Sequence, residues 1–414
     1  MQLASHTSPR RHLVPPSWSR CGTRASARRR DPLMLALISL ALGLATAACG
    51  TRTAGQQPQS TTCPSSSVSN QPTSSVIVQA IQLITGSSGW ALTNNALSET
   101  NDGGQTWATI TPPDVPVSTI RGVFFLDTQH GWAVSALANN PTQLQISTTT
   151  DGGSSWTTSP LGNPDPLFID SAHIPAYVDF VDAQHGWVVA LIASGSGVLP
   201  RGMLFRTSNG GATWQEVRMP LGGNVEFVNS SVGWLAAGEQ GTGLYVTSDG
   251  GQTWSPTAVT PPAGYAARQA TYTIPDFTVP ATLIQVAFDN GTSSAAGFYQ
   301  TSDSGGTWQL AASIPSGSAQ GSAAVTGNGQ WIVMATDGNT ITRFTNDGAN
   351  AVSVCSSGLP SSAGYGDPTF TDAGLGWVIG DQQTCAGFKT NCTETVALYG
   401  TTNNGTNFAE LPVP

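Results

Sequence analysis

Short runs that alternate hydrophobic and other residues recur along this chain, and most of them end just before a Gly–Trp pair. A Leu or Phe stands seven residues before the Trp in five segments, and an Ile or Val stands nine before it in four. An alternation with a period of two predicts half-buried β-strands. The tryptophans of this signature are Trp90, Trp132, Trp187, Trp234, Trp331 and Trp377.

A second pattern, [Ser/Thr]-x-[Asp/Asn]-x-Gly-x-[Ser/Thr]-Trp, follows each signature, and we call it the box. Its Asp/Asn positions recur every 40 to 58 residues, and two further apolar runs separate signature and box. Four strands per unit predict an all-β fold, a seven-bladed β-propeller of four-stranded antiparallel blades with the box as the turn between strands 3 and 4. A solenoid would need shorter, more even repeats and caps. The box positions are Asp102, Asp151, Asn209, Asp249, Asp303, Asp347 and Asn403.

The box residues are expected to stabilise turns rather than to act on a ligand. An Asp or Asn in a tight turn accepts hydrogen bonds from nearby backbone amides, and glycines supply the positive φ angles. Asn209 and Asn403 replace Asp, which favours hydrogen bonding over a needed charge. Eleven tryptophans after residue 49 all occupy repeat positions, so none remains to bind sugars. His130 and His185 share one turn position and are interpreted as part of the repeat.

The first 48 residues differ from the rest and indicate an export signal. Arginines precede an apolar run over 33–48, and Ala47-Ala48-Cys49 resembles a lipoprotein cleavage site with Cys49 as the lipidated residue. An uncleaved anchor or plain secretion stays open. Residues 49–75 are polar and predict a disordered tether. We therefore expect a propeller over 76–414, lipid-anchored to the outer face of a bacterial cytoplasmic membrane or secreted.

The net charge and the cysteines limit which functions the chain can have. After residue 48 the chain keeps eight basic and 23 acidic residues, a net charge of −15, which argues against nucleic-acid binding. Four cysteines then remain besides Cys49, and an even number outside the cytoplasm indicates two disulfides. Their short spacing pairs Cys385 with Cys392, which leaves Cys63 for Cys355. No zinc-like spacing occurs, so neither a metal nor a cofactor is expected.

A ligand is expected at the end of the propeller opposite the boxes. The long irregular segments 160–174, 191–201, 256–281 and 381–394 are predicted to gather there, and such loops commonly bind partners. We call this end the long-loop face. Its candidate binding residues are Arg121, Asp165, Asp170, His173, Tyr177, Arg201, Tyr265, Arg268, Tyr272 and Lys389.

One pair of acidic residues is a candidate for catalysis. Asp179 and Glu226 both stand eight residues before a signature Trp, so they occupy equivalent positions in consecutive units. Two carboxyl groups at such positions could act as acid and base on a glycoside. The other interpretation is a hydrated polar pair on the inner strands.

The boxes resemble the BNR or Asp-box repeats of sialidases, xyloglucanases and sortilin-type receptors. The longer pattern over about 76–412 looks most like the photosystem II stability/assembly-factor propellers and their non-photosynthetic bacterial relatives. The resemblance implies a propeller, and it carries no activity over. The Arg-Ile-Pro motif and arginine triad of sialidases, the second propeller of xyloglucanases and the arginine patch of the assembly factors are all missing from this chain.

The sequence thus favours an extracytoplasmic lipoprotein with a non-catalytic propeller that binds a protein or cell-envelope partner through the long-loop face. A glycoside hydrolase of sialidase-like or xyloglucanase-like type is the alternative from the enzyme class. A structural surface adhesin is the third possibility. The ligand, the oligomeric state and the exact signal cleavage stay open.

Overall fold

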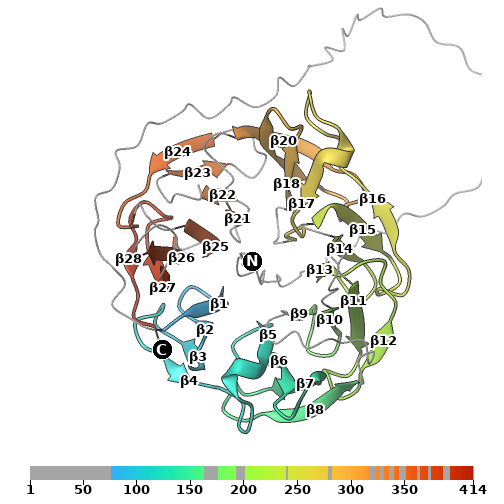
Figure 1. The fold of residues 1–414 in the computed structure, drawn as a ribbon, viewed down its shortest axis with the longest axis vertical. Coiled ribbons are helices and arrows are strands. Elements are labelled where there is room, and N and C mark those ends of the chain that lie inside the picture. The colour runs from blue at the N-terminus through green and yellow to red at the C-terminus, as the bar shows by residue number, and fades with distance from the viewer. Residues whose placement is uncertain are drawn as a thin grey trace, which may run out of the picture.

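The chain forms a closed ring of small sheets around a central axis (Figure 1). The computed structural model describes residues 76–162, 176–192, 201–238, 241–277, 282–316, 322–325, 331–334, 340–344, 351–360, 364–371, 374–385 and 392–413. Each four-stranded sheet is antiparallel and keeps the chain order of its strands. The first strand of each sheet lies nearest the axis and the fourth lies at the rim (Figure 1). This arrangement is a β-propeller.

The strands are short, as the period-two pattern predicts. The first three sheets contain β1 (Val78–Leu83), β2 (Gly89–Thr93), β3 (Leu97–Thr100) and β4 (Ala108–Thr109); β5 (Ile120–Phe125), β6 (Gly131–Leu137), β7 (Asn140–Thr149) and β8 (Thr157–Gly162); and β9 (Ala176–Phe180), β10 (Gly186–Ile192), β11 (Arg201–Thr207) and β12 (Gln215–Val217). The next two contain β13 (Gly223–Phe227), β14 (Gly233–Ala237), β15 (Gly243–Thr247) and β16 (Ser255–Thr257), then β17 (Ala270–Tyr272), β18 (Leu283–Asp289), β19 (Ser294–Gln300) and β20 (Gln309–Ser316).

The last two sheets complete the ring. They contain β21 (Ser322–Val325), β22 (Trp331–Met334), β23 (Thr340–Phe344) and β24 (Ala351–Cys355), then β25 (Gly364–Phe370), β26 (Gly376–Cys385), β27 (Cys392–Thr401) and β28 (Ala409–Glu410). Two 3-10 turns, η1 (Val117–Thr119) and η3 (Ala267–Gln269), each lead into the first strand of a sheet.

The prediction of a seven-bladed propeller with a box turn in its blades is corrected by the structure. Six sheets are complete blades whose box turn is described, with Asp102, Asp151, Asn209, Asp249, Asp303 and Asn403. The sheet β21–β24 is the exception, because its expected box around Asp347 lies outside the described residues. Its sequence has Ala349 where the other boxes share a glycine, and Val352 where they have Trp or Phe.

Neighbouring blades are joined by aromatic stacking, and we call each such contact a seam. The signature Trp132 stacks on Phe180 of the next blade with ring centroids 3.6 Å apart, and Trp187 stacks on Phe227 at 3.5 Å. The box tryptophan Trp214 meets Phe180 edge-on at 6.0 Å. Each Phe is therefore held between two tryptophans, which explains why the signature and the box recur together.

The ring closes without exchange of a strand between its ends. Strands β1–β4 and β25–β28 each come from one continuous segment. The first blade packs on the last through a buried cluster that includes Ile81, Leu83, Trp377 and Leu411. The indole N–H of Trp107 also donates to the carbonyl oxygen of Pro412 over 2.7 Å.

Two of the segments predicted as long loops contain strands instead. The segment 256–281 includes η3 and the inner strand β17, so only 258–269 connects two blades. The segment 381–394 continues β26 to Cys385 and begins β27 at Cys392. The fifth unit lacks a Gly–Trp pair, which is why the sequence pattern missed its inner strand. The expected export signal, Cys49 and the tether lie outside the described residues.

Candidate functional site

The box turns satisfy their own polar groups. Oδ1 of Asp102 accepts hydrogen bonds from the backbone N–H groups of Gln105 and Thr106 at 3.0 and 2.9 Å. Its Oδ2 accepts from the Thr106 hydroxyl at 2.6 Å, and the Thr100 hydroxyl donates to Oδ1. The Thr106 hydroxyl and amide and the Thr100 hydroxyl lower the pKa of Asp102 to about 2. The carboxylate is therefore engaged within the turn.

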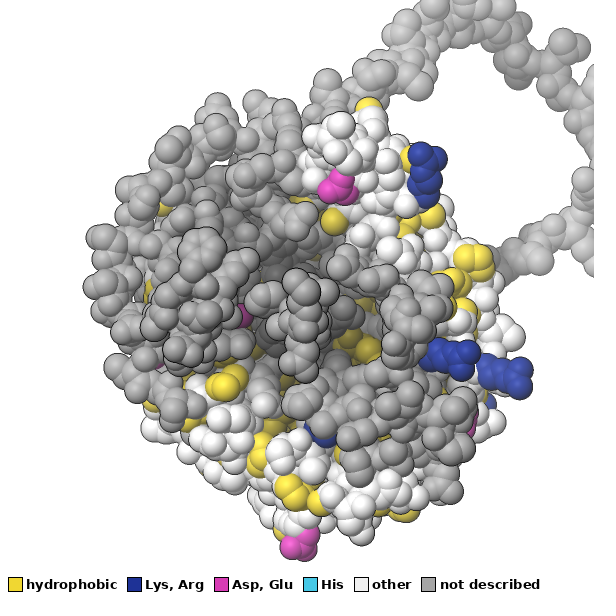
Figure 2. All heavy atoms as spheres, viewed as in Figure 1, with side chains coloured by type: hydrophobic (Ala, Val, Ile, Leu, Met, Phe, Trp, Pro, Cys, Tyr) yellow, Lys and Arg dark blue, Asp and Glu magenta, His cyan; other side chains and the backbone are white. Residues whose placement is uncertain are grey.

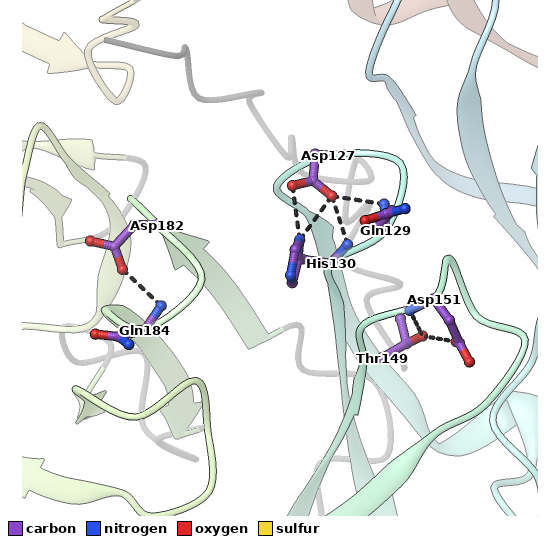
Figure 3. A network of polar contacts seen from close by, with 7 residues as sticks. All are labelled: Asp127, Gln129, His130, Thr149, Asp151, Asp182 and Gln184. Carbon is purple, nitrogen blue, oxygen red and sulfur yellow. Dashed lines mark hydrogen bonds and ion pairs between the residues drawn. The ribbon is translucent and has the colours of Figure 1, made fainter.

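The turns between strands 1 and 2 use a related arrangement and lie beside the boxes. Oδ1 of Asp127 accepts from the backbone N–H groups of Gln129 and His130, and Oδ2 lies 2.9 Å from His130 Nδ1 (Figure 3). The amide of Gly152 in the box donates to the carbonyl oxygen of Gln129. Asp182 and His185 repeat the pair in the next blade. Because the two pairs are equivalent, they belong to the repeat.

The candidate catalytic carboxyl groups are buried between blades. Asp179 on β9 and Glu226 on β13 are each only 3% exposed. Oδ2 of Asp179 accepts a hydrogen bond of 2.6 Å from the backbone N–H of Phe227. Burial raises the pKa of Asp179 to about 7, against the opposing effect of that bond. Burial and the neighbouring charges of Asp179 and Asp276 raise the pKa of Glu226.

A third acid, Asp276, occupies in the next unit the position that Asp179 and Glu226 occupy in theirs, and we call the three residues the acidic row. The sequence pattern did not identify Asp276. Asp276 forms a β-bridge with Leu283, as Asp179 pairs with Trp187 and Glu226 pairs with Trp234. Each of the three acids precedes a Phe that packs near the previous blade's signature Trp. In the fifth unit Leu283 takes the place of the Trp. The Asp-Phe pair at 276–277, which matches the one at 179–180, could have identified this position from the sequence.

Two of the residues predicted for the long-loop face belong to the core instead. Tyr177 is 3% exposed and Tyr272 is 5% exposed, in the clusters of β9–β16 and β13–β20 respectively. Tyrosines on inner strands point between blades, so they offer no surface to a ligand. The remaining candidates Asp165, Asp170, His173 and Lys389 lie outside the described residues.

The structure does place four candidates at the long-loop end. Arg201 begins β11, and Arg268 lies in η3; both are exposed. Tyr265 donates its hydroxyl to Ser293 in the β18–β19 turn over 3.2 Å. Arg121 is partly buried on β5 and donates to backbone carbonyl oxygens, and burial lowers its pKa.

No other site emerges from the described part of the chain. Within it no group of three His, Cys, Asp or Glu residues is arranged to hold a metal ion, and no helix is long and apolar enough to cross a membrane. Among the described side chains on the face in Figure 2, only a few are charged. Cys355 forms a disulfide bond, while the predicted partner Cys63 lies outside the described residues. The backbones of Cys385 and Cys392 face each other across β26 and β27.

Comparison with known proteins found similar chains among solved structures. No family model matches the chain, and no curated protein matches it. A YCF48 protein bound to a D1 peptide is 18% identical, with a TM-score of 0.42 over 70% of this chain and 80% of that chain. YCF48 from Cyanidioschyzon merolae is 16% identical, with a TM-score of 0.48 over 75% and 94%.

The chain is also similar in structure to an enzyme. An oligogalacturonate lyase in complex with manganese is 10% identical, with a TM-score of 0.50 over 78% of this chain and 85% of that chain. At such identities a likeness concerns the scaffold and not the activity. The chain is a β-propeller.

Proposed function

We propose that this chain is an extracytoplasmic lipoprotein whose propeller binds a protein or cell-envelope partner through the long-loop face and catalyses no reaction. The supporting observation is the contrast between the two ends of the ring. At the box end the aspartates of the turns are already engaged in hydrogen bonds. At the long-loop end Arg201 and Arg268 are exposed and form no ion pair with any described residue.

The geometry of the acidic row argues against a glycosidase. A hydrolase needs two carboxyl groups that reach a sugar from open space. Asp179 and Glu226 are instead almost fully buried, and Asp179 is bound to the backbone of the next blade. The signature tryptophans Trp90, Trp132, Trp187, Trp234 and Trp377 are buried. Neither the acids nor these tryptophans can contact a sugar unless the blades of the propeller separate.

Binding is tested by changing the exposed arginines. The double variant Arg201→Ala, Arg268→Ala is compared with the wild type and with the control Arg206→Ala, whose arginine lies on β11 directly before the box and so at the opposite end of the propeller. Each protein is cross-linked to an envelope preparation, and captured partners are quantified by mass spectrometry. We expect the double variant to lose partners that the wild type and the control retain. Equal capture by all three would contradict this binding face.

Catalysis and anchoring are tested separately. The purified protein is expected to release no sugar from sialosides or β-glucans. Hydrolysis that disappears in both Asp179→Asn and Glu226→Gln, with folding intact, would establish the enzyme instead. For the anchor, labelling of cells with an alkyne fatty acid should mark the wild type and not Cys49→Ala. A labelled Cys49→Ala protein would refute lipidation at that residue.

A further inference from the structure

At the seam between the first and second blades, Gln82 occupies the position that Asp179 and Glu226 occupy in later blades. Its side chain is an amide instead of an acid. Gln82 is 1% exposed. Its Oε1 accepts from the backbone N–H of Phe125 at 3.2 Å, and its Nε2 donates to the carbonyl oxygen of Phe125 at 2.9 Å. Oε1 also accepts from the indole N–H of Trp90 at 2.7 Å. A neutral side chain with both a donor and an acceptor thus holds two inner strands together.

Asp179 occupies the same position two blades further on. Its Oδ2 accepts from the backbone N–H of Phe227, as Gln82 Oε1 accepts from Phe125. Its Oδ1 is buried and has no hydrogen-bond partner among the described residues. An ionised carboxylate with one buried, unsatisfied oxygen is costly, because its charge has lost water without gaining a partner. A proton on Oδ1 would make this side chain neutral and give it the donor that Gln82 has.

Among the described residues the backbone N–H groups of Phe227 and Phe180 favour the ionised form of Asp179, but burial outweighs them and no basic side chain pairs with it. Its own strand β9 carries Tyr177, and β13 carries the acid Glu226, which itself faces Asp276. Strands β6 and β10 contain no titratable residue. Strand β5 contributes Arg121, whose guanidinium is bound to backbone carbonyl oxygens near the start of its strand. The closest charged neighbour is therefore another acid.

We propose that Asp179 joins β9 to β13 as a neutral carboxylic acid, with its proton on Oδ1, and that release of this proton to solvent weakens the seam. The contact between β9 and β13 is therefore more stable in acid than at mildly alkaline pH. It is independent of the proposed partner. Burial raises the pKa of Asp179 to about 7, in agreement with the geometry.

The direction of the pH effect follows from the two states. An unfolded Asp titrates near pH ~4. Between that value and about 7 the folded protein holds a proton that the unfolded chain has released. The stability from this group is therefore fully present below about pH 4, falls as the pH rises to 7, and is absent above it.

The experiment replaces the acid by its amide. In Asp179→Asn one side-chain oxygen still accepts from Phe227, and the amide N–H₂ supplies the donor at every pH. Glu216→Gln is the control, because it makes the same charge change at an exposed position on β12 of the same blade. Urea unfolding midpoints of the full chain are measured between pH 4 and pH 8.5.

We expect the wild type and Glu216→Gln to lose midpoint concentration between pH 4 and pH 7, and Asp179→Asn to lose clearly less. At pH 8 Asp179→Asn should unfold at a urea concentration at least equal to that of the wild type. An unchanged pH profile in Asp179→Asn would overturn the proposal, as would a lower midpoint at every pH.

A direct titration keeps the test decisive if Asp179→Asn fails to fold. The wild type is labelled with ¹³C at the aspartate carboxyl carbons, and their chemical shifts are followed by NMR over the same pH range. One buried aspartate should titrate near 7, about three pH units above the exposed ones. If every aspartate titrates below pH 5, the carboxylic acid at this seam does not exist.

Discussion

The indole N–H of Trp377 donates to the carbonyl oxygen of Gly103 over 3.2 Å, across 274 positions of the sequence. The same bond recurs within the ring, from Trp132 to Gly210 at 3.0 Å and from Trp187 to Gly250 at 3.1 Å. The seam that closes the ring is therefore built like the internal ones. At these three seams the signature tryptophan of one blade donates to the box turn of the next.

Trp377→Phe should loosen the ring at its two ends. The change leaves the buried carbonyl oxygen of Gly103 without its donor, which costs about 1–3 kcal/mol. Amide hydrogen exchange should then speed up in β1–β4 and β25–β28 together. Trp132→Phe, which removes the same bond at an internal seam, is the control. Faster exchange confined to the last blade in Trp377→Phe would show that this bond does not hold the closure.

Asp249→Ala should destabilise the propeller by about 1–3 kcal/mol in urea unfolding, since it removes the acceptor for the amide and hydroxyl of Thr253. Asp249→Asn should be mild, because Asn209 serves the same turn. The Thr253 and Thr247 bonds lower the pKa of Asp249 to about 2.

The stability from Asp249 is therefore present above the unfolded pKa of ~4 and lost as the pH falls through about 2. Unfolding of Asp249→Asn should lack this acid-dependent loss. Partner capture by folded Asp249→Ala should equal that of the wild type. A variant that unfolds like the wild type yet captures nothing would give this aspartate a binding role.

The second glycine of a box should tolerate substitution less than the first. Both have positive φ, 76° for Gly103 and 94° for Gly104. A Cβ on Gly103 would meet nothing closer than 3.7 Å, whereas on Gly104 it would lie 2.9 Å from Leu411 of the last blade. Ser304 and Asn404 already occupy the first position in other boxes with φ of 57° and 55°.

Gly103→Ala should therefore cost about 1–2 kcal/mol for the backbone conformation alone. Gly104→Ala should cost about 1–3 kcal/mol more, because the new methyl group enters a packed seam. Thermal unfolding of the two variants measures the difference. Equal losses would mean that the seam yields easily at this point.

Trp234→Phe should be milder than Trp187→Phe. The indole N–H of Trp187 has an acceptor in Gly250, whereas that of Trp234 is buried with none among the described residues. Trp234 also lies 6.3 Å from Phe277 in a tilted arrangement, in contrast to the close stack of Trp187. The difference in unfolding free energy should be about 1–2 kcal/mol. A larger loss in Trp234→Phe would contradict this ranking.

We expect Cys63, Cys355, Cys385 and Cys392 all to form disulfide bonds. Peptide mapping without reduction should recover Cys355 linked to Cys63, and Cys385 linked to Cys392. A disulfide that ties Cys63 to Cys355 closes a long segment and should stabilise the fold by about 2–4 kcal/mol. Alkylation of two or more thiols in the native, unreduced protein would refute this pairing.

Part of the structure follows from local chemistry, and the sequence alone determined it. The period-two runs before Gly–Trp predict inner strands, and the box predicts an Asx-type turn whose bonds lie within five residues of Asp102. Such features depend on backbone geometry near one residue, so the copies that keep the pattern could be recognised. The assignment of 256–281 to a loop failed because the fifth unit has Leu283 where others have Trp.

Only the tertiary structure decided what the row of acids does. In the sequence Asp179 and Glu226 are two carboxyl groups at equivalent positions, which suits a catalytic pair as well as a structural one. The structure buries both at 3% exposure, adds Asp276, and attaches Asp179 to Phe227 of the next blade. It also moves Tyr177 and Tyr272 from the long-loop face into the core. Burial and hydrogen bonds across a seam depend on how two distant segments pack, and no local pattern records that.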